Sequence, residues 1–177
     1  MRIRSKLAIK CAKLTSNTIK KMNRGSGATL PGLVARLIDP KILSTMSDMV
    51  REKTIVTMGT NGKTTTNAIL YKALEAEGNK VIINRTGANM LNGIISAFVL
   101  ATNDDCQLDI DYACIECDEF ASKTVLPMLK PDCVLLTNIS RDQLDRFGEI
   151  DITYNVIKGA FTSVPDTTLI INCDDIL

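Results

Sequence analysis

The segment GTNGKTTT at residues 59–66 constrains the fold more than any other part of the sequence. A run of β-branched residues precedes it, and a helical stretch follows it. Gly59 and Gly62 allow the backbone to curl and to approach an anion closely. We expect the amide N–H groups of residues 61–65 to point into an anion site at the positive end of that helix. Strand, glycine-rich turn and helix in this order predict a phosphate-binding loop in an α/β protein.

The side chains of this loop suit a nucleotide triphosphate. Lys63 is placed to reach the β- and γ-phosphates, and the hydroxyl of Thr64 is placed to bind Mg²⁺. The segment is a variant of the usual pattern, because Thr57 stands where that pattern has its first glycine. The chain contains no N-K-x-D guanine-reading motif, so we predict ATP as the ligand. A phosphate-binding loop alone does not choose between kinase, ATPase and ligase.

The rest of the chain alternates between strands and helices. Short apolar runs rich in β-branched residues occur at 54–58, 80–84, 113–116, 133–137 and 167–172. Helical stretches between them end near residues 77 and 101, begin near residue 119, and cover about 152–163. Continuous apolar strands in this rhythm predict an α/β fold, with a mostly parallel sheet and helices on both faces. Ligands of such sheets bind beyond the carboxyl ends of the strands.

The last apolar run has the composition of an interior strand, although the chain stops at Leu177, five residues after it. A parallel strand normally needs a crossover helix to cover the sheet. We therefore expect this chain to be the first portion of a longer protein, with its last domain incomplete at the carboxyl end.

Polar residues gather where two of the predicted strands end. Glu116 ends a buried strand, which is where a carboxylate can bind Mg²⁺ opposite the phosphate-binding loop. Asp118 and Glu119 follow it and have two interpretations, as further site residues or as helix-capping residues. The strand at 133–137 leads into the segment TNISRDQLDRFGE at 137–149, which brings more polar side chains to the same edge of the sheet.

Composition excludes several kinds of chemistry. The 177 residues include no His, so nucleophile–His pairs, His metal ligands and imidazole acid–base catalysis are absent. The six cysteines read as reduced thiols. Cys114 and Cys117 form a lone C-x2-C that we place in a buried strand, where residues three apart point to opposite faces. Core thiols are the favoured interpretation, and a zinc pair completed elsewhere is the alternative.

The amino-terminal part is strongly basic. The first 36 residues carry nine Lys or Arg and no acid, although the net charge of the whole chain is +1. We assign residues 1–50 to a basic N-terminal helical segment and linker, with an apolar side at Leu7, Ile9, Leu14 and Ile19. The segment is too interrupted for a secretory signal. Three interpretations stay open: a solvated face, contact with an anionic surface, and docking on the acidic remainder of the protein.

Together, GTNGKTTT, the strand ending in Glu116 and TNISRDQLDRFGE resemble the central ATPase domain of the Mur ligases. LPGLVA at 30–35 and the short basic N-terminus are similar to the MurT subgroup, the ligase subunits of lipid II isoglutaminyl synthase. The resemblance assigns residues 51–177 to a Mur ligase central ATP-binding domain, truncated, with a fold like that of P-loop NTPases. It implies a cytoplasmic enzyme of peptidoglycan synthesis that can contact the inner face of the membrane, and no nucleic-acid partner.

The resemblance also implies a reaction. ATP phosphorylates the α-carboxyl of the D-glutamate in the stem peptide of lipid II, and ammonia from a GatD-like glutaminase partner displaces the phosphate to give D-isoglutamine. Carried over by position, Lys63 and Glu116 are catalytic, and Thr64 and Glu116 bind Mg²⁺. The residues implied to bind ATP are Gly59, Thr60, Asn61, Gly62, Lys63, Thr64, Thr65, Asn138 and Asp142.

One position departs from the wider family pattern. Most Mur ligases have a metal-binding His where this chain has Gln143. The MurT subgroup also has Gln at this position. A four-cysteine zinc ribbon is expected only beyond Leu177. Two alternative functions stay open: another Mur-type ligase similar to folylpolyglutamate synthetase, and an ATP-binding fragment without catalysis.

Overall fold

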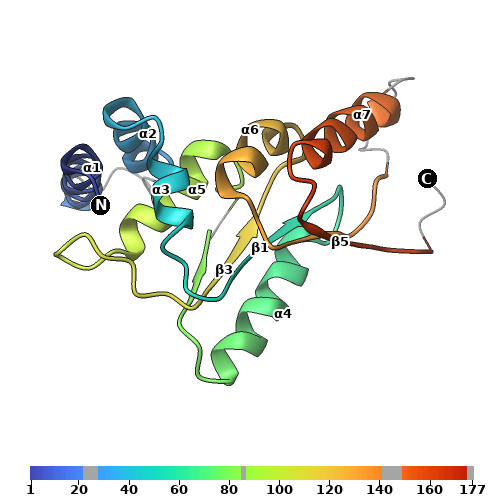
Figure 1. Ribbon diagram of the computed structural model, residues 1–177, viewed down its shortest axis with the longest axis horizontal. Coiled ribbons are helices and arrows are strands. Elements are labelled where there is room, and N and C mark those ends of the chain that lie inside the picture. Colours follow the sequence, from blue (N-terminus) through green and yellow to red (C-terminus); the bar gives the residue numbers. More distant parts are fainter. Residues whose placement is uncertain (22–27, 85–86, 141–148, 175–177) are drawn as a thin grey trace.

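Five parallel strands form the central sheet of the computed structural model, which describes residues 1–21, 28–84, 87–140 and 149–174 (Figure 1). The strands are β1 (Lys53–Met58), β2 (Val81–Ile83), β3 (Tyr112–Glu116), β4 (Cys133–Leu136) and β5 (Thr168–Ile171). Their order across the sheet is β2-β3-β1-β4-β5, and every neighbouring pair is parallel. The prediction of a parallel α/β sheet is confirmed, and each predicted strand lies within a few residues of its observed position.

Helices that connect the strands cover both faces of the sheet. They are α4 (Lys63–Ala76), α5 (Leu91–Ala101), α6 (Glu119–Leu129) and α7 (Glu149–Thr162). Figure 1 shows α4 below the sheet, and α5, α6 and α7 above it. The chain moves from β1 to the edge strand β2 through α4 and then returns through the helices of the other face. This reversal places β1 in the middle of the sheet, where its carboxyl end has a strand on each side.

The last strand differs from its predicted environment. Residues 167–172 were expected to form an interior strand, but among the described residues β5 pairs only with β4 and lies at the edge of the sheet. The side chains of Leu169, Ile170 and Ile171 are 43–55% exposed. An apolar run shows that a strand can be buried on both faces, but it does not show which segment covers it.

Three N-terminal helices extend the layer above the sheet. They are α1 (Ile3–Lys21), α2 (Leu30–Ile38) and α3 (Ile42–Ser47). The backbone of Gly32 in α2 lies directly on α5, and its N–H donates to Ser96 Oγ at 2.8 Å. A Cβ at Gly32 would be 1.9 Å from the carbonyl oxygen of Asn92. In turn, α1 packs on α2, and its buried residues are Ser5, Ala8, Ile9, Ala12 and Ser16.

The apolar side predicted for the N-terminal segment is therefore divided in the structure. Ile9 is fully buried, whereas Leu7 and Leu14 are 54% and 68% exposed. No helix in the described ranges has both the length and the apolar composition that crossing a bilayer requires.

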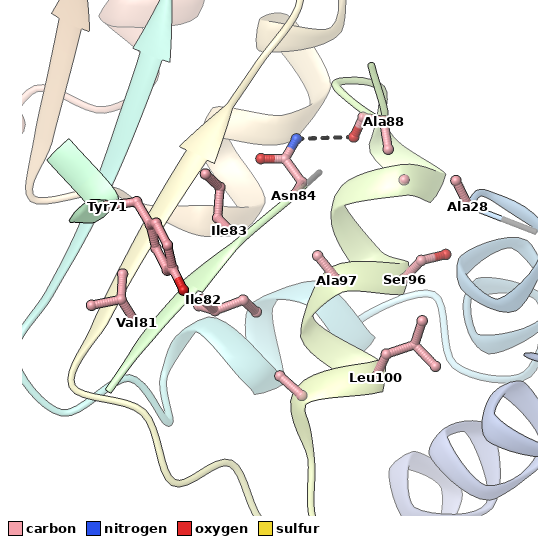
Figure 2. Close-up of a pocket in the computed structure, with 12 residues that line it drawn as sticks. Ala28, Tyr71, Val81, Ile82, Ile83, Asn84, Ala88, Ser96, Ala97 and Leu100 are labelled. Atoms are coloured by element: carbon pink, nitrogen blue, oxygen red, sulfur yellow. Dashed lines mark hydrogen bonds between the residues drawn. The ribbon is translucent and has the colours of Figure 1, made fainter. Parts of the chain in front are cut away.

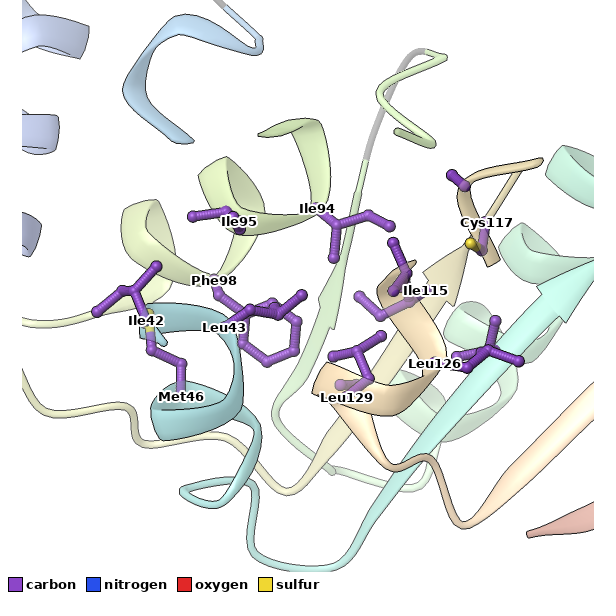
Figure 3. Close-up of a cluster of buried hydrophobic side chains, with 14 of the residues drawn as sticks. Ile42, Leu43, Met46, Ile94, Ile95, Phe98, Ile115, Cys117, Leu126 and Leu129 are labelled. Carbon is purple, nitrogen blue, oxygen red and sulfur yellow. The ribbon is translucent and has the colours of Figure 1, made fainter. Parts of the chain in front are cut away.

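The hydrophobic core joins the N-terminal helices to the sheet (Figure 3). Phe98 of α5 is fully buried near Leu43 and Met46 of α3, with Leu129 of α6 on the other side. Ile115 of β3 extends this cluster to the sheet. Burial of a large apolar side chain stabilises a fold by about 1.5–3 kcal/mol. The cluster thus fixes the positions of α5 and α6, which border the carboxyl end of β3.

Candidate functional site

The loop between β1 and α4 requires glycine at two positions. Gly59 has a φ of +123° and Gly62 a φ of +83°, a region of backbone space that other residues rarely adopt. A Cβ at Gly59 would also lie 2.3 Å from Thr137 Oγ1 and 2.7 Å from the carbonyl oxygen of Asn138. The loop can follow this path only because Gly59 has no side chain.

Residues that follow β4 hold the loop in place. Asn138 makes three of the contacts: its carbonyl oxygen accepts from Thr60 N at 2.9 Å, its Oδ1 accepts from Asn61 N at 3.1 Å, and its Nδ2 donates to Asn61 O at 2.9 Å. Thr137 Oγ1 donates to the same Asn61 oxygen at 2.7 Å. Ser140 completes the connection through hydrogen bonds with Thr60 and Asn61. These hydrogen bonds tie the loop to the end of the neighbouring strand.

This arrangement changes which amides can meet an anion. The N–H groups of Thr60 and Asn61 are already used by Asn138, although we expected the free amides to begin at residue 61. Lys63, Thr64 and Thr65 form the first turn of α4, where no side chain caps the helix. Amides in a first turn have no acceptor within the helix. The anion site expected here therefore begins at the start of α4 rather than in the loop.

Lys63 folds back over the loop from which it extends. Its Nζ donates to the carbonyl oxygen of Gly59 and, at 3.2 Å, to that of Thr60. It also forms an ion pair with Glu119 Oε1 at 3.1 Å, and the two side chains are only 14% and 12% exposed. A largely buried cation needs such partners, because losing water without compensation is costly. The ammonium group thus lies directly over the loop.

Thr64 and Glu116 meet between α4 and β3. Thr64 Oγ1 donates to Glu116 Oε2 at 2.9 Å, and Glu116 is 5% exposed. The register of the sheet explains the meeting, because Glu116 pairs with Thr57 of β1, two residues before the glycine loop. A hydroxyl and a carboxylate are the oxygen ligands that Mg²⁺ accepts beside phosphate oxygens and water. The donor set therefore suits Mg²⁺ bound to a nucleotide.

Two asparagines that the sequence analysis did not single out support Glu116. Asn84, which follows β2, accepts from Glu116 N at 2.8 Å and donates to the carbonyl oxygen of Glu116 at 2.7 Å. Asn89 Nδ2 approaches Glu116 Oε1 at 3.4 Å. Both come from the connection between β2 and α5, at the same carboxyl edge of the sheet. Asn84 ends the predicted strand at 80–84 and Asn89 lies in the connection that follows it, so the end of that strand was the sequence signal for both.

The two acids after β3 take different roles. Asp118 is the N-cap of α6, and its side chain accepts from the backbone N–H groups of Phe120 and Ala121. Glu119 is the partner of Lys63. The capping interpretation therefore applies to Asp118, and Glu119 belongs to the site. Asp142 lies outside the described residues.

A cavity of about 470 Å³ borders the site along the edge strand β2 (Figure 2). Its wall is mainly aliphatic, with Ile82 of β2 and Leu100 of α5 on opposite sides. Asn84 is the residue it shares with the site, and its Nδ2 also donates to the carbonyl oxygen of Ala88 at 2.9 Å. The side-chain amide of Asn84 is thus turned towards the backbone oxygens of Ala88 and Glu116.

The C-x2-C pair is buried beside the site. Cys114 lies on β3, and Cys117 lies just after the strand rather than on it, and both are fully buried. Burial raises the pKa of the Cys114 thiol to about 12. Burial raises the pKa of Cys117 as well, and the nearby carboxylates of Asp118 and Glu119 add to the effect. Both sulfurs therefore stay protonated and behave as core thiols. In the part of the chain that the structure describes, no three His, Cys, Asp or Glu side chains gather into a metal-binding group.

Comparison with known proteins agrees with this geometry. Residues 56–177 match the model of the Mur ligase middle domain, which is more than half of the chain. The chain belongs to the Mur ligase family.

Relatives with known names place the chain within the Mur ligases. It is 36% identical over 174 residues to the lipid II isoglutaminyl synthase (glutamine-hydrolyzing) subunit MurT of Streptococcus pneumoniae, across 98% of this chain and 38% of that protein. It is 38% identical over 168 residues to the MurT subunit of Staphylococcus aureus strain COL, across 95% of this chain and 37% of that protein. The chain thus spans less than two fifths of the length of these relatives.

Solved Mur ligase structures share the fold. MurF from Acinetobacter baumannii superposes with a TM-score of 0.64 at 20% identity, across 80% of this chain and 31% of that one. MurF from Thermotoga maritima, solved in complex with ADP, superposes with a TM-score of 0.63 at 19% identity, across 76% of this chain and 31% of that one. The fold is that of the Mur ligase central domain.

Proposed function

We propose that this chain carries the nucleotide-binding site of an ATP-dependent amide-forming ligase subunit of peptidoglycan synthesis. The observation that carries the proposal is the pairing of Lys63 with Glu119 and of Thr64 with Glu116 at the start of α4. Membership of the Mur ligase family supports the same conclusion. As part of this proposal, residues 51–177 form the central ATP-binding domain, and residues 1–50 form a basic helical segment and linker.

The residues have distinct roles in this proposal. The first-turn amides of α4 bind phosphate oxygens, together with Lys63, and Thr64 and Glu116 hold Mg²⁺. Asn138 keeps the loop in shape, and Asp142 is assigned to the nucleotide site from the family resemblance. Bound Mg²⁺ supplies positive charge that stabilises the transferring phosphoryl group. Lys63 adds to this charge when its ammonium exchanges the loop carbonyl oxygens and Glu119 for phosphate oxygens.

The names of the MurT relatives support a narrower proposal for the substrate and partner. The carboxyl group that is activated as an acyl phosphate is the α-carboxyl of D-glutamate in a lipid II-type stem peptide. Ammonia comes from a GatD-like glutaminase subunit, and the product is D-isoglutamine. Because such a substrate is lipid-linked, the enzyme works in the cytoplasm at the inner face of the membrane.

The variant Glu116→Gln tests this function in the full-length protein with its glutaminase partner. We expect it to bind ATP but to form D-isoglutamine at least about a hundredfold more slowly, because a carboxamide holds Mg²⁺ poorly against the γ-phosphate. Amidation of lipid II is measured by mass spectrometry. Glu77→Gln, an exposed change at the far end of α4, is the matched control and keeps full activity.

Three results would contradict the proposal. Normal amidation by Glu116→Gln would return Glu116 to a structural role. Failure of the unmodified complex to amidate lipid II, together with ATP-dependent ligation of another carboxylate, would favour a different Mur-type ligase. ATP binding without any ligation would identify a non-catalytic nucleotide-binding protein.

A further inference from the structure

One side of α1 faces away from the protein and is both apolar and basic. Ile3, Leu7 and Leu14 are 88%, 54% and 68% exposed. Their spacing of four and then seven residues places them on one side of the helix, opposite the buried residues of α1. Exposed cations lie along the same side at Lys6, Lys10 and Lys21. We call these three aliphatic residues and three cations the outward face of α1.

The charges of the outward face are not used to hold α1 on the protein. Two other cations do that work: Arg4 Nε donates to the carbonyl oxygen of Ile38 at 2.5 Å, and Lys13 Nζ donates to that of Asn103 at 2.9 Å. Both contacts lie at helix C-termini, where cations are favoured. None of the ion pairs found among the described residues involves α1. Within the described residues, docking on an acidic surface therefore does not account for the basic charge.

We propose that the outward face of α1 binds an anionic lipid bilayer. Aliphatic side chains flanked by lysines on one side of a helix are the composition of helices that lie in the membrane interface. Lysine stems lie along the apolar layer while their ammonium groups stay at the lipid phosphates. Each cation near an anionic surface strengthens binding about fivefold, and the attraction fades beyond roughly 10 Å at 0.1 M salt.

A nucleic acid fits this face less well. Proteins that bind single strands stack bases on aromatic side chains, and α1 contains no aromatic residue. Three exposed aliphatic side chains find no apolar partner on a phosphate backbone, whereas a bilayer has partners for both the apolar and the charged groups.

The position of α1 is compatible with binding at a surface. Figure 1 places α1 at the left end of the molecule, beyond α2 and away from α4 and the sheet. A bilayer against this end leaves the start of α4 accessible. The choice of a lipid surface rests on the proposed function, in which the substrate is lipid-linked, but the binding itself requires no ATP.

Tryptophan fluorescence of the full-length protein tests the proposal. These 177 residues contain no Trp, so Leu7→Trp adds a reporter to the outward face, and Ile69→Trp adds one to α4 at a residue that is 66% exposed. The emission of the unmodified full-length protein is subtracted from that of both variants. The probe is a vesicle of one part phosphatidylglycerol to two parts phosphatidylcholine. We expect the emission of the Leu7→Trp variant to shift to the blue on these vesicles at low salt and to stay unchanged on pure phosphatidylcholine. The emission of the Ile69→Trp variant should shift on neither.

Two results of this experiment would overturn the proposal. If the emission of the Leu7→Trp variant is already blue-shifted before vesicles are added, another part of the protein covers the outward face of α1. An unshifted emission that stays unchanged on the anionic vesicles would also contradict the proposal, because the reporter would then not enter the bilayer.

Co-sedimentation with the same vesicles gives the second measurement. Lys6→Gln with Lys10→Gln should weaken binding about 25-fold, and Leu7→Ser with Leu14→Ser at least about tenfold. The matched exposed changes Lys123→Gln and Ile69→Ser should have no effect. Binding that is absent at low salt, unchanged in the α1 variants, or displaced in favour of an RNA oligomer would overturn the proposal.

Failure of this inference is distinguishable from failure of the proposed function. ATP binding and amidation of detergent-solubilised substrate, without vesicle binding, would remove the membrane surface and leave the ligase. Vesicle binding by a protein that does not bind ATP would contradict the proposed function and leave the membrane-binding surface.

Discussion

At the scale of single residues, the site is organised around a lysine whose partners all come from the protein itself. Lys63 pairs with Glu119 at 3.1 Å, and both side chains are mostly withdrawn from water. A charge in such a position destabilises the protein unless it is paired. Glu119 is therefore the resting counter-ion of Lys63, and the phosphates of a nucleotide must compete with it.

This competition predicts the effect of Glu119→Gln. The change removes a negative charge near the phosphates and frees the ammonium group, so we expect Mg-ATP to bind about 1–2 kcal/mol more tightly. The removal also leaves Lys63 without its counter-ion, so the ligand-free protein should unfold at a lower urea concentration. Calorimetric titration and urea unfolding measure the two effects. Weaker Mg-ATP binding would show that Glu119 itself contacts the nucleotide or its metal.

Sequence patterns predicted the site residues unevenly. Lys63, Thr64 and Glu116 could be placed together, because a glycine loop and a strand end define their positions along parallel strands. Asn84 and the pairing of Glu119 could not be predicted, since they depend on how the end of β2 packs beside the end of β3. Spacing in the sequence contains no information on that lateral packing.

At the scale of elements, the contact between α2 and α5 depends on a glycine. The backbone of Gly32 approaches Asn92 so closely that a Cβ would lie 1.9 Å from the Asn92 carbonyl oxygen. Gly159 in α7 is the opposite case, since a Cβ there would meet nothing within 4 Å. The two positions offer the same substitution in a tight and an open environment.

We expect Gly32→Ala to lower the free energy of unfolding by about 1–3 kcal/mol, because α2 must move away from α5. Gly159→Ala should raise it by up to about 1 kcal/mol, because alanine restricts the unfolded chain and favours a helix. Urea unfolding followed by circular dichroism measures both. Equal effects of the two changes would contradict the close approach of α2 to α5.

A second group of contacts joins the segments at the amino ends of the strands. Arg51 forms ion pairs with Asp109 and Asp111, and Lys80 pairs with Asp109. A hydrogen bond from the Lys80 side chain is the main cause that lowers the pKa of Asp109. A hydrogen bond from the Lys80 backbone is the main cause that lowers the pKa of Asp111. The cluster links the segments that lead into β1, β2 and β3.

These lowered pKa values make a stability difference that depends on pH. A carboxyl group with a lowered pKa in the folded state stabilises the protein above its ordinary pKa of about 3.8, and this contribution is lost as the pH falls through the lowered value. Asp109→Asn with Asp111→Asn should therefore reduce the urea midpoint at neutral pH, and the difference should shrink below about pH 4. Asp166→Asn, at an exposed residue with no ion pair in the described part of the chain, is the control. A difference that stayed constant with pH would contradict the assignment.

At the scale of the whole molecule, alternation of strands and helices was sufficient to predict the parallel sheet. Helix and strand boundaries followed from glycine positions and β-branched runs, since these express local preferences of the backbone. The packing of α1 and α2 on α5 and the edge position of β5 were not predictable. Both depend on contacts between segments far apart in the sequence, which residue patterns describe only as apolar or polar.

The central claim is that the start of α4 binds Mg-ATP through Lys63. Calorimetric titration of Mg-ATP into the unmodified protein, Lys63→Ala and the exposed control Lys123→Ala tests it most directly. Removal of a charge-assisted contact to phosphate should weaken binding by about 2–4 kcal/mol, which corresponds to roughly 30-fold to 1,000-fold in affinity. The control should bind as the unmodified protein does. Unchanged affinity in a folded Lys63→Ala protein would contradict the account.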